Sequence, residues 1–205
     1  MKRKISWNIY IGAFIISIII FGVGVYLGAK LNIFLMGNLG EEFESLNIRM
    51  HSYEILFLLD NSTMACELYK ENINYFDTET YNLGATLEYM EQHQGVEDRE
   101  LKKQYFELEA RDYLISKKII QQCDIDQLII LYFYSNTHCD YCKEQGFELT
   151  KVKEEVNINN QTNVRTYSFD GDYDDSAVVR ALKKEFDIDK YPTLIINGEK
   201  YEGFR

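Results

Sequence analysis

Two cysteines with two residues between them carry the strongest chemical signal in the chain. Cys139 and Cys142 follow an apolar run at 128–134 that is rich in β-branched and aromatic residues and predicts a buried strand. Residues 143–149 return to a helical composition. We therefore expect the pair at a strand-to-helix turn with Cys139 at the helix start, where free backbone N–H groups and the helix dipole favour a thiolate. Cys142, one turn along, can close a disulfide with Cys139.

Three kinds of chemistry compete for this pair: disulfide exchange, half of a metal site, or an inert structural disulfide. A zinc site normally takes four ligands. The sequence has no second closely spaced cysteine pair, and His138 is poorly placed to join both sulfurs. We therefore favour redox chemistry, and we expect neither a metal nor another cofactor.

The composition narrows the class of protein. The chain has 205 residues and a formal net charge of −11. A phosphate-binding face needs clustered lysine and arginine, so we expect no nucleic-acid partner. The remaining cysteines, Cys66 and Cys123, both fall in segments of helical pattern. A structural disulfide between them is the favoured expectation, and a second redox pair or free buried thiols are the alternatives.

An uncharged segment near the N-terminus predicts a membrane anchor within residues 1–29. Residues 5–29 carry no charged side chain and follow three basic ones. The segment is long enough to cross about 30 Å of hydrocarbon as a helix. The alternative is a cleaved signal peptide, whose apolar region is usually shorter, about 7–15 residues. Because the basic residues come first, the positive-inside rule keeps the N-terminus in the cytoplasm and places the C-terminal part of the chain outside.

A linker and a helical region are expected after the anchor. Residues 30–40 contain glycines, which are typical of turns and loops, and we interpret this segment as a membrane-proximal linker. Residues 41–123 have helical periodicity and predict a hairpin or small bundle of helices. Breaks between these helices are expected near residues 60, 77 and 95. The helical region can act as a spacer, a lid or a dimerisation element that makes the protein a homodimer, and the pattern does not choose among them.

Residues 124–205 alternate between strand and helix patterns. Strands are expected at 128–134 and 164–169, and an Asn-Gly turn at 197–198 predicts a hairpin of two more strands. A helix follows each of the first two strands, and Asp174 or Asp175 is the expected cap of the second. Strand–helix–strand units favour parallel pairing, whereas the hairpin adds antiparallel strands. We therefore expect an α/β fold with a mixed four-stranded sheet and flanking helices.

Residues 128–205 resemble the thioredoxin-like superfamily of thiol-disulfide oxidoreductases. The resemblance rests on the cysteine pair that opens a helix and on Pro192, the single proline of the chain, which opens a strand about 50 residues later. In that family the proline is cis and lies against the cysteine pair. The residue before it, here Tyr191, pairs its backbone with the substrate. Tyr141 is a candidate substrate contact or simply fills the motif. His138 is a further candidate contact, although the family often has an aromatic residue at that position.

The resemblance implies an anchored enzyme that exchanges thiols and disulfides of exported proteins outside the cytoplasm, served by an unidentified membrane redox partner. Cys139 attacks and Cys142 resolves the mixed disulfide. The direction stays open among oxidation, isomerisation and reduction, because His138 and Asp140 bring opposite charges to the motif. The alternative from another class is a non-catalytic, membrane-anchored interaction protein that uses the domain as a scaffold.

Besides His138, two further departures from the family pattern affect these expectations. The family often has a buried carboxylate six residues before the first cysteine, which accepts the proton of the second cysteine. That position is Phe133 here, so another group or water must take the proton. The closing helix of the family has no counterpart after the hairpin, and residues 97–123 are expected to cover the sheet instead.

Overall fold

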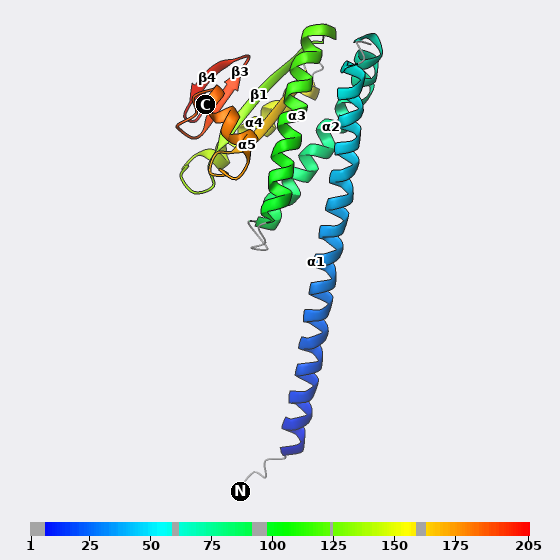
Figure 1. Ribbon diagram of the computed structural model, residues 1–205. Coiled ribbons are helices and arrows are strands. Elements are labelled where there is room, and N and C mark those ends of the chain that lie inside the picture. Colours follow the sequence, from blue (N-terminus) through cyan, green and yellow to red (C-terminus); the bar gives the residue numbers. More distant parts are fainter. Residues whose placement is uncertain (1–6, 59–61, 92–97, 124, 159–162) are drawn as a thin grey trace. The chain divides into compact units, whose positions relative to one another are not determined.

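The computed structural model describes residues 7–58, 62–91, 98–123, 125–158 and 163–205. The chain divides into two compact units, residues 1–42 and 43–205. Its elements are α1 (Trp7–Leu58), α2 (Ser62–Tyr89), α3 (Arg99–Cys123), β1 (Gln127–Tyr134), α4 (Cys142–Ile158), β2 (Asn163–Asp170), α5 (Ala177–Glu185), β3 (Thr193–Ile196) and β4 (Glu199–Glu202) (Figure 1). The expected breaks near residues 60 and 95 lie outside the described residues.

The first unit is the N-terminal part of α1. Its segment Tyr10–Gly28 is long and apolar enough to cross a membrane, and its side chains are not buried by the rest of the protein. The linker expected at 30–40 is wrong, because the backbone of α1 stays helical through it. A glycine in a helix interior costs only about 1 kcal/mol. The scattered glycines therefore do not stop a helix in which most other residues favour helix.

The second unit contains the expected mixed four-stranded sheet, with the order β2-β1-β3-β4. The central strand β1 pairs with β2 in parallel and with β3 antiparallel. The hairpin of β3 and β4 turns at Asn197-Gly198, where both residues have positive φ. Asparagine and glycine are the residues that best tolerate this conformation, which is why the Asn-Gly signal located the turn.

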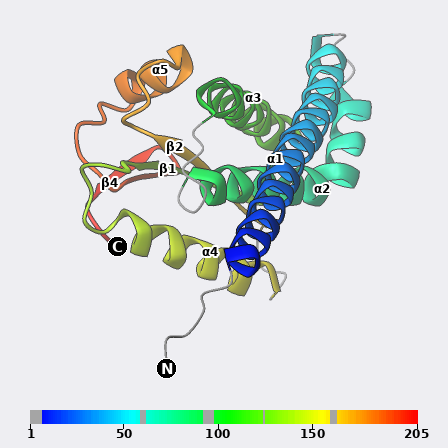
Figure 2. The ribbon, with the colours of Figure 1, turned by 90° about the horizontal axis from the view of Figure 1, so that it is seen from below.

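Helices cover both faces of the sheet, with α4 on one side and α3 and α5 on the other (Figure 2). Successive side chains of β1 point to opposite faces of the sheet, so its apolar residues contribute to the hydrophobic core on both sides. The cluster on the α3 side includes Phe106, Ala110, Tyr113, Leu131, Phe133, Tyr167 and Phe169. The cluster on the α4 side includes Ile130, Tyr132, Leu149, Val164 and Leu194. Helix α3 thus covers the sheet as expected.

A buried polar network joins α2 and α3 to the edge strand β2. The guanidinium of Arg165 is 2% exposed and pairs with the carboxylate of Asp112. It also lies 3.3 Å from the hydroxyl of Tyr69. A disulfide between Cys66 and Cys123 ties the same two helices together. The helical region and the sheet therefore belong to one compact unit rather than to two domains.

Two local expectations are wrong. The break near residue 77 does not occur, since α2 continues to Tyr89. The carboxylate of Asp77 does not cap a helix; it binds the ammonium of Lys153 at 2.7 Å. The cap of α5 is Ser176, whose side chain accepts from the N–H of Val179, and neither Asp174 nor Asp175 takes this role.

Candidate functional site

The cysteine pair lies at the C-terminal end of β1, where the chain enters α4. The sulfurs of Cys139 and Cys142 form a disulfide with an S–S distance of 2.02 Å. Helix α4 begins at Cys142 and not at Cys139, because the carbonyl of Tyr141 accepts the first helical hydrogen bond, from the N–H of Gln145 at 3.0 Å. Cys139 precedes the helix, but its sulfur is bonded to Cys142 in the first turn. The positive end of the helix dipole therefore still faces the pair.

The two cysteines differ in exposure. Cys142 is 7% exposed, whereas Cys139 is half-buried. Cys139 is therefore the more accessible residue of the disulfide.

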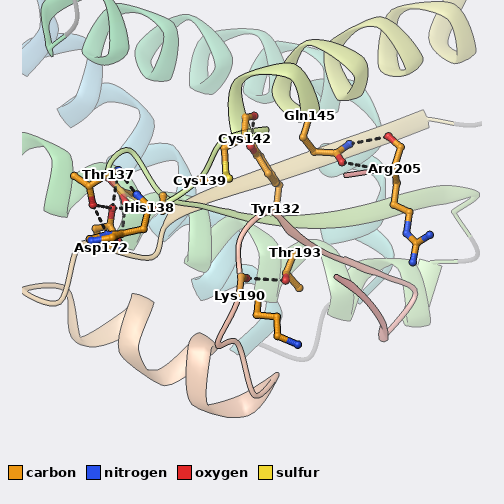
Figure 3. Close-up of a disulfide and its surroundings, with 12 residues drawn as sticks. Tyr132, Thr137, His138, Cys139, Cys142, Gln145, Asp172, Lys190, Thr193 and Arg205 are labelled. Atoms are coloured by element: carbon orange, nitrogen blue, oxygen red, sulfur yellow. Dashed lines mark hydrogen bonds and ion pairs between the residues drawn. A yellow bond between two sulfur atoms is a disulfide. The ribbon is translucent and has the colours of Figure 1, made fainter. Parts of the chain in front are cut away.

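The proline loop lies at the same end of the sheet. The Tyr191–Pro192 peptide bond is cis. The next residue, Thr193, pairs with Phe133 near the end of β1, so the antiparallel register brings this loop beside the cysteine turn. Figure 3 shows Thr193 below the disulfide, where its hydroxyl donates to the carbonyl of Lys190 at 2.8 Å.

The loop between β1 and the cysteines is held by Asp172, from the turn after β2. Its carboxylate accepts hydrogen bonds from the hydroxyls of Ser135 at 2.7 Å and Thr137 at 2.8 Å. The backbone N–H of His138 donates to the hydroxyl of Ser135 at 2.7 Å. Ser135, Thr137 and Asp172 are not among the site residues predicted from the sequence.

The segment after β4 borders the pair on the opposite side from Asp172 (Figure 3). The side-chain amide of Gln145 is buried and accepts from the backbone N–H of Arg205 at 2.8 Å. The rings of Tyr141 and Phe204 are both exposed, with centroids 6.0 Å apart. An aromatic surface therefore flanks the disulfide.

Phe133 occupies the position where the thioredoxin-like superfamily often has a buried carboxylate, and its surroundings in the structure are apolar. Phe133 is fully buried in the cluster on the α3 side. On the other face, the hydroxyl of Tyr132 donates to the backbone carbonyl of Cys142. Burial raises the pKa of Tyr132 well above its ordinary value, so this hydroxyl stays protonated. Within the described residues, no group of three His, Cys, Asp or Glu side chains is placed to hold a metal ion.

The sequence-predicted site residues fall into two groups. Cys139, Cys142, His138 and Tyr141 lie in one turn, and Tyr191 and Pro192 lie in the adjacent loop. The other disulfide is remote: Cys123 precedes the start of β1, whereas Cys139 follows its end. An eight-residue strand spans roughly 23 Å at about 3.3 Å per residue. The two disulfides are therefore at opposite ends of the sheet, which argues against a direct relay between them.

Comparison of the chain with protein-family models, curated proteins and solved structures gives no match. The mixed sheet with flanking helices and the close cysteine pair are compatible with a thioredoxin-like fold.

Proposed function

We propose that this protein is a thioredoxin-like thiol-disulfide oxidoreductase, with Cys139 and Cys142 as its redox pair. One observation carries the proposal. A half-buried and a buried cysteine form a disulfide at the end of the central strand, beside the loop that contains Pro192. A purely structural disulfide has no need of an accessible sulfur, whereas an exchanging one requires it.

The chemistry is a pair of thiol-disulfide exchanges. In the reductive direction, the Cys139 thiolate attacks a substrate disulfide; a mixed disulfide forms and the first substrate thiolate leaves. The Cys142 thiolate then attacks the sulfur of Cys139, which closes the Cys139–Cys142 disulfide and releases the second substrate thiolate. Oxidation of a dithiol substrate is the same sequence reversed. Each cycle transfers two electrons, and a redox partner must restore the starting state.

The proposal includes a membrane anchor. The apolar segment of α1 holds the protein in the membrane, and the three basic residues before it favour a cytoplasmic N-terminus. The substrates are then thiols or disulfides of exported proteins. An extracytoplasmic site also suits the second disulfide, because structural disulfides persist in oxidising compartments.

The test is exchange between a fluorescent peptide disulfide and the full chain in detergent, which is first reduced and then freed of the reductant, because only the dithiol form can cleave a disulfide. The wild-type protein is expected to cleave the peptide, and Cys139→Ser is expected to abolish cleavage. Cys142→Ser should accumulate a mixed disulfide between Cys139 and the peptide, because the resolving thiol is gone. Joint replacement of Cys66 and Cys123 by serine is the matched control, which should keep exchange.

If the folded wild-type protein neither reduces nor oxidises the peptide, and Cys139 is alkylated no faster than Cys142, the enzyme proposal fails. A non-catalytic scaffold would then be the better hypothesis.

A further inference from the structure

The carboxylate of Asp172 binds several groups of the loop that leads into the cysteine pair. Besides the hydroxyls of Ser135 and Thr137, it accepts from the backbone N–H of Thr137 at 3.2 Å. Partial burial acts to raise the pKa of Asp172, but the hydrogen bonds from Ser135 and Thr137 outweigh it and lower that pKa below its ordinary value. Asp172 therefore carries a full negative charge at neutral pH.

This charge faces the residue directly before the attacking cysteine. The imidazole Nδ1 of His138 lies 3.7 Å from the carboxylate of Asp172 and 2.6 Å from the hydroxyl of Thr137. Figure 3 shows His138, Thr137 and Asp172 gathered on one side of the disulfide. A protonated His138 would stabilise a thiolate at Cys139, and the carboxylate of Asp172 opposes that effect.

Other charges near this end of β1 are paired elsewhere or lie farther along the motif. The carboxylate of Asp170 binds the ammonium of Lys102 at 3.0 Å and the amide of Asn136 at 2.9 Å. The carboxylate of Asp170 also accepts a hydrogen bond from the backbone N–H of Asp172 at 3.0 Å, and this bond helps to position Asp172. In the part of the chain that the structure describes, His138 is the ion-pair partner of Asp172. Asp140 is exposed within the motif and is present in every variant discussed below.

We propose that Asp172 is a positioning residue that holds His138 and the loop before Cys139, places a negative charge beside the cysteine pair, and thereby sets the redox potential of the Cys139–Cys142 pair. When His138 is protonated, Asp172 also balances its charge. The inference rests on the proposed exchange function and concerns the redox potential of that same site. A thiolate at Cys139 of the dithiol form carries a negative charge that the disulfide form lacks. A positive charge beside Cys139 therefore favours the dithiol and makes the protein more oxidising, and a negative charge does the opposite.

For each variant, the charge that remains near Cys139 determines whether the dithiol or the disulfide is favoured. Asp172→Asn removes a negative charge and leaves His138 unbalanced, so the dithiol is favoured. His138→Gln leaves Asp172 unbalanced, so the disulfide is favoured. With both replaced, the charges removed are opposite, and the potential should return towards that of the wild type.

The experiment equilibrates the full chain in detergent with mixtures of reduced and oxidised glutathione. In this reaction, one protein disulfide and two molecules of reduced glutathione give one protein dithiol and one molecule of glutathione disulfide. Atoms and electrons are therefore balanced. The fraction of dithiol is measured by alkylation and mass spectrometry. Asp172→Asn is expected to shift the equilibrium constant three- to tenfold towards the dithiol, where tenfold corresponds to about 30 mV. His138→Gln is expected to shift it towards the disulfide, and the double variant should lie within twofold of the wild type.

Two further variants separate charge balance from a structural effect. Asp172→Glu keeps the charge and should restore most of the wild-type potential. Asp175→Asn is the matched control, since Asp175 is an exposed acid of the same turn that pairs with Arg99 at 2.6 Å; its potential should equal that of the wild type.

The inference is overturned if folded Asp172→Asn stays within twofold of the wild type or shifts towards the disulfide. It is equally overturned if His138→Gln, whose side chain is 80% exposed and carries little risk to folding, shifts towards the dithiol. The proposed function is judged separately, by reduction or oxidation of the peptide and by the alkylation rates of the two cysteines. A wild type that equilibrates with glutathione but neither reduces nor oxidises the peptide, and whose Cys139 is alkylated no faster than Cys142, refutes the function and leaves the role of Asp172 in the potential measurable.

Discussion

At the scale of single residues, Glu109 is a carboxyl group with a strongly raised pKa that lies away from the cysteine motif. Glu109 lies on α3 and accepts from the hydroxyl of Tyr105 at 3.0 Å, while its second oxygen is buried without a hydrogen-bond partner. Burial is the main cause that raises the pKa of Glu109 to about 8, and the nearby Asp112 adds to it. Glu109 is thus held as a neutral acid in the helical layer, and its ionisation should affect stability.

The prediction is that Glu109 makes the protein less stable as the pH rises. Its pKa is higher in the folded than in the unfolded chain, so the folded state binds more protons between about pH 4.5 and pH 8. The free energy of unfolding then falls across this window, by up to roughly 5 kcal/mol at 1.36 kcal/mol per pKa unit. Thermal unfolding at pH 5 and pH 8 should show a smaller loss for Glu109→Gln than for the wild type. An unchanged pH dependence in that variant would contradict the prediction.

A glycine beside the proline loop gives a second prediction at this scale. The backbone of Gly171 lies against the ring of Tyr191, and a methyl group added there would overlap this ring. Gly171→Ala should displace Tyr191, slow exchange with the peptide disulfide at least severalfold and cost about 1–3 kcal/mol of stability, as overpacking typically does. Exchange rate and unfolding midpoint measure the two effects.

Gly146 in α4 provides the matched control. An added Cβ there would meet Tyr132 at an ordinary distance of 3.9 Å. Gly146→Ala should therefore leave exchange unchanged and stabilise the helix by up to about 1 kcal/mol. Equal losses of exchange in the two alanine variants would refute the contact between Gly171 and Tyr191 as the cause.

At the scale of elements, α2 and α3 are built into the same unit as the sheet. The disulfide between Cys66 and Cys123 closes a loop with a sequence separation of 57 residues. In the chain-entropy model such a cross-link stabilises the folded state by about 4 kcal/mol. Replacing both cysteines by serine should lower the free energy of unfolding by about this amount, as measured by urea denaturation. Exchange at Cys139 should persist under conditions where the variant is folded, and its loss there would show that the second disulfide takes part in the chemistry.

The elements differ in how far the sequence could predict them. The strands and the hairpin were predictable because β-branched runs and an Asn-Gly turn act locally. The linker at 30–40 and the break near residue 77 were wrong, because glycine and aspartate are only weak local stop signals. In α2, Asp77 instead binds Lys153, which is 76 residues away in the sequence. The contact between Asp172 and the cysteine turn likewise joins segments that are distant in the sequence, and strand register brings them together. The local sequence around Asp172 could not reveal it.

At the scale of the whole molecule, the proposed anchor makes a prediction about the side of a membrane on which the cysteine pair lies. The segment Tyr10–Gly28 predicts that the chain stays in the membrane fraction after an alkaline carbonate wash, and that a variant lacking residues 1–29 is released. Right-side-out vesicles treated with an impermeant reductant and an impermeant thiol reagent should be labelled at Cys139, because the proposed orientation has the N-terminus inside and the cysteine pair outside. Inverted vesicles should be labelled only after permeabilisation. The variant in which serine replaces both Cys139 and Cys142 corrects for labelling elsewhere. Labelling of intact inverted vesicles would reverse the proposed orientation and place the substrates in the cytoplasm.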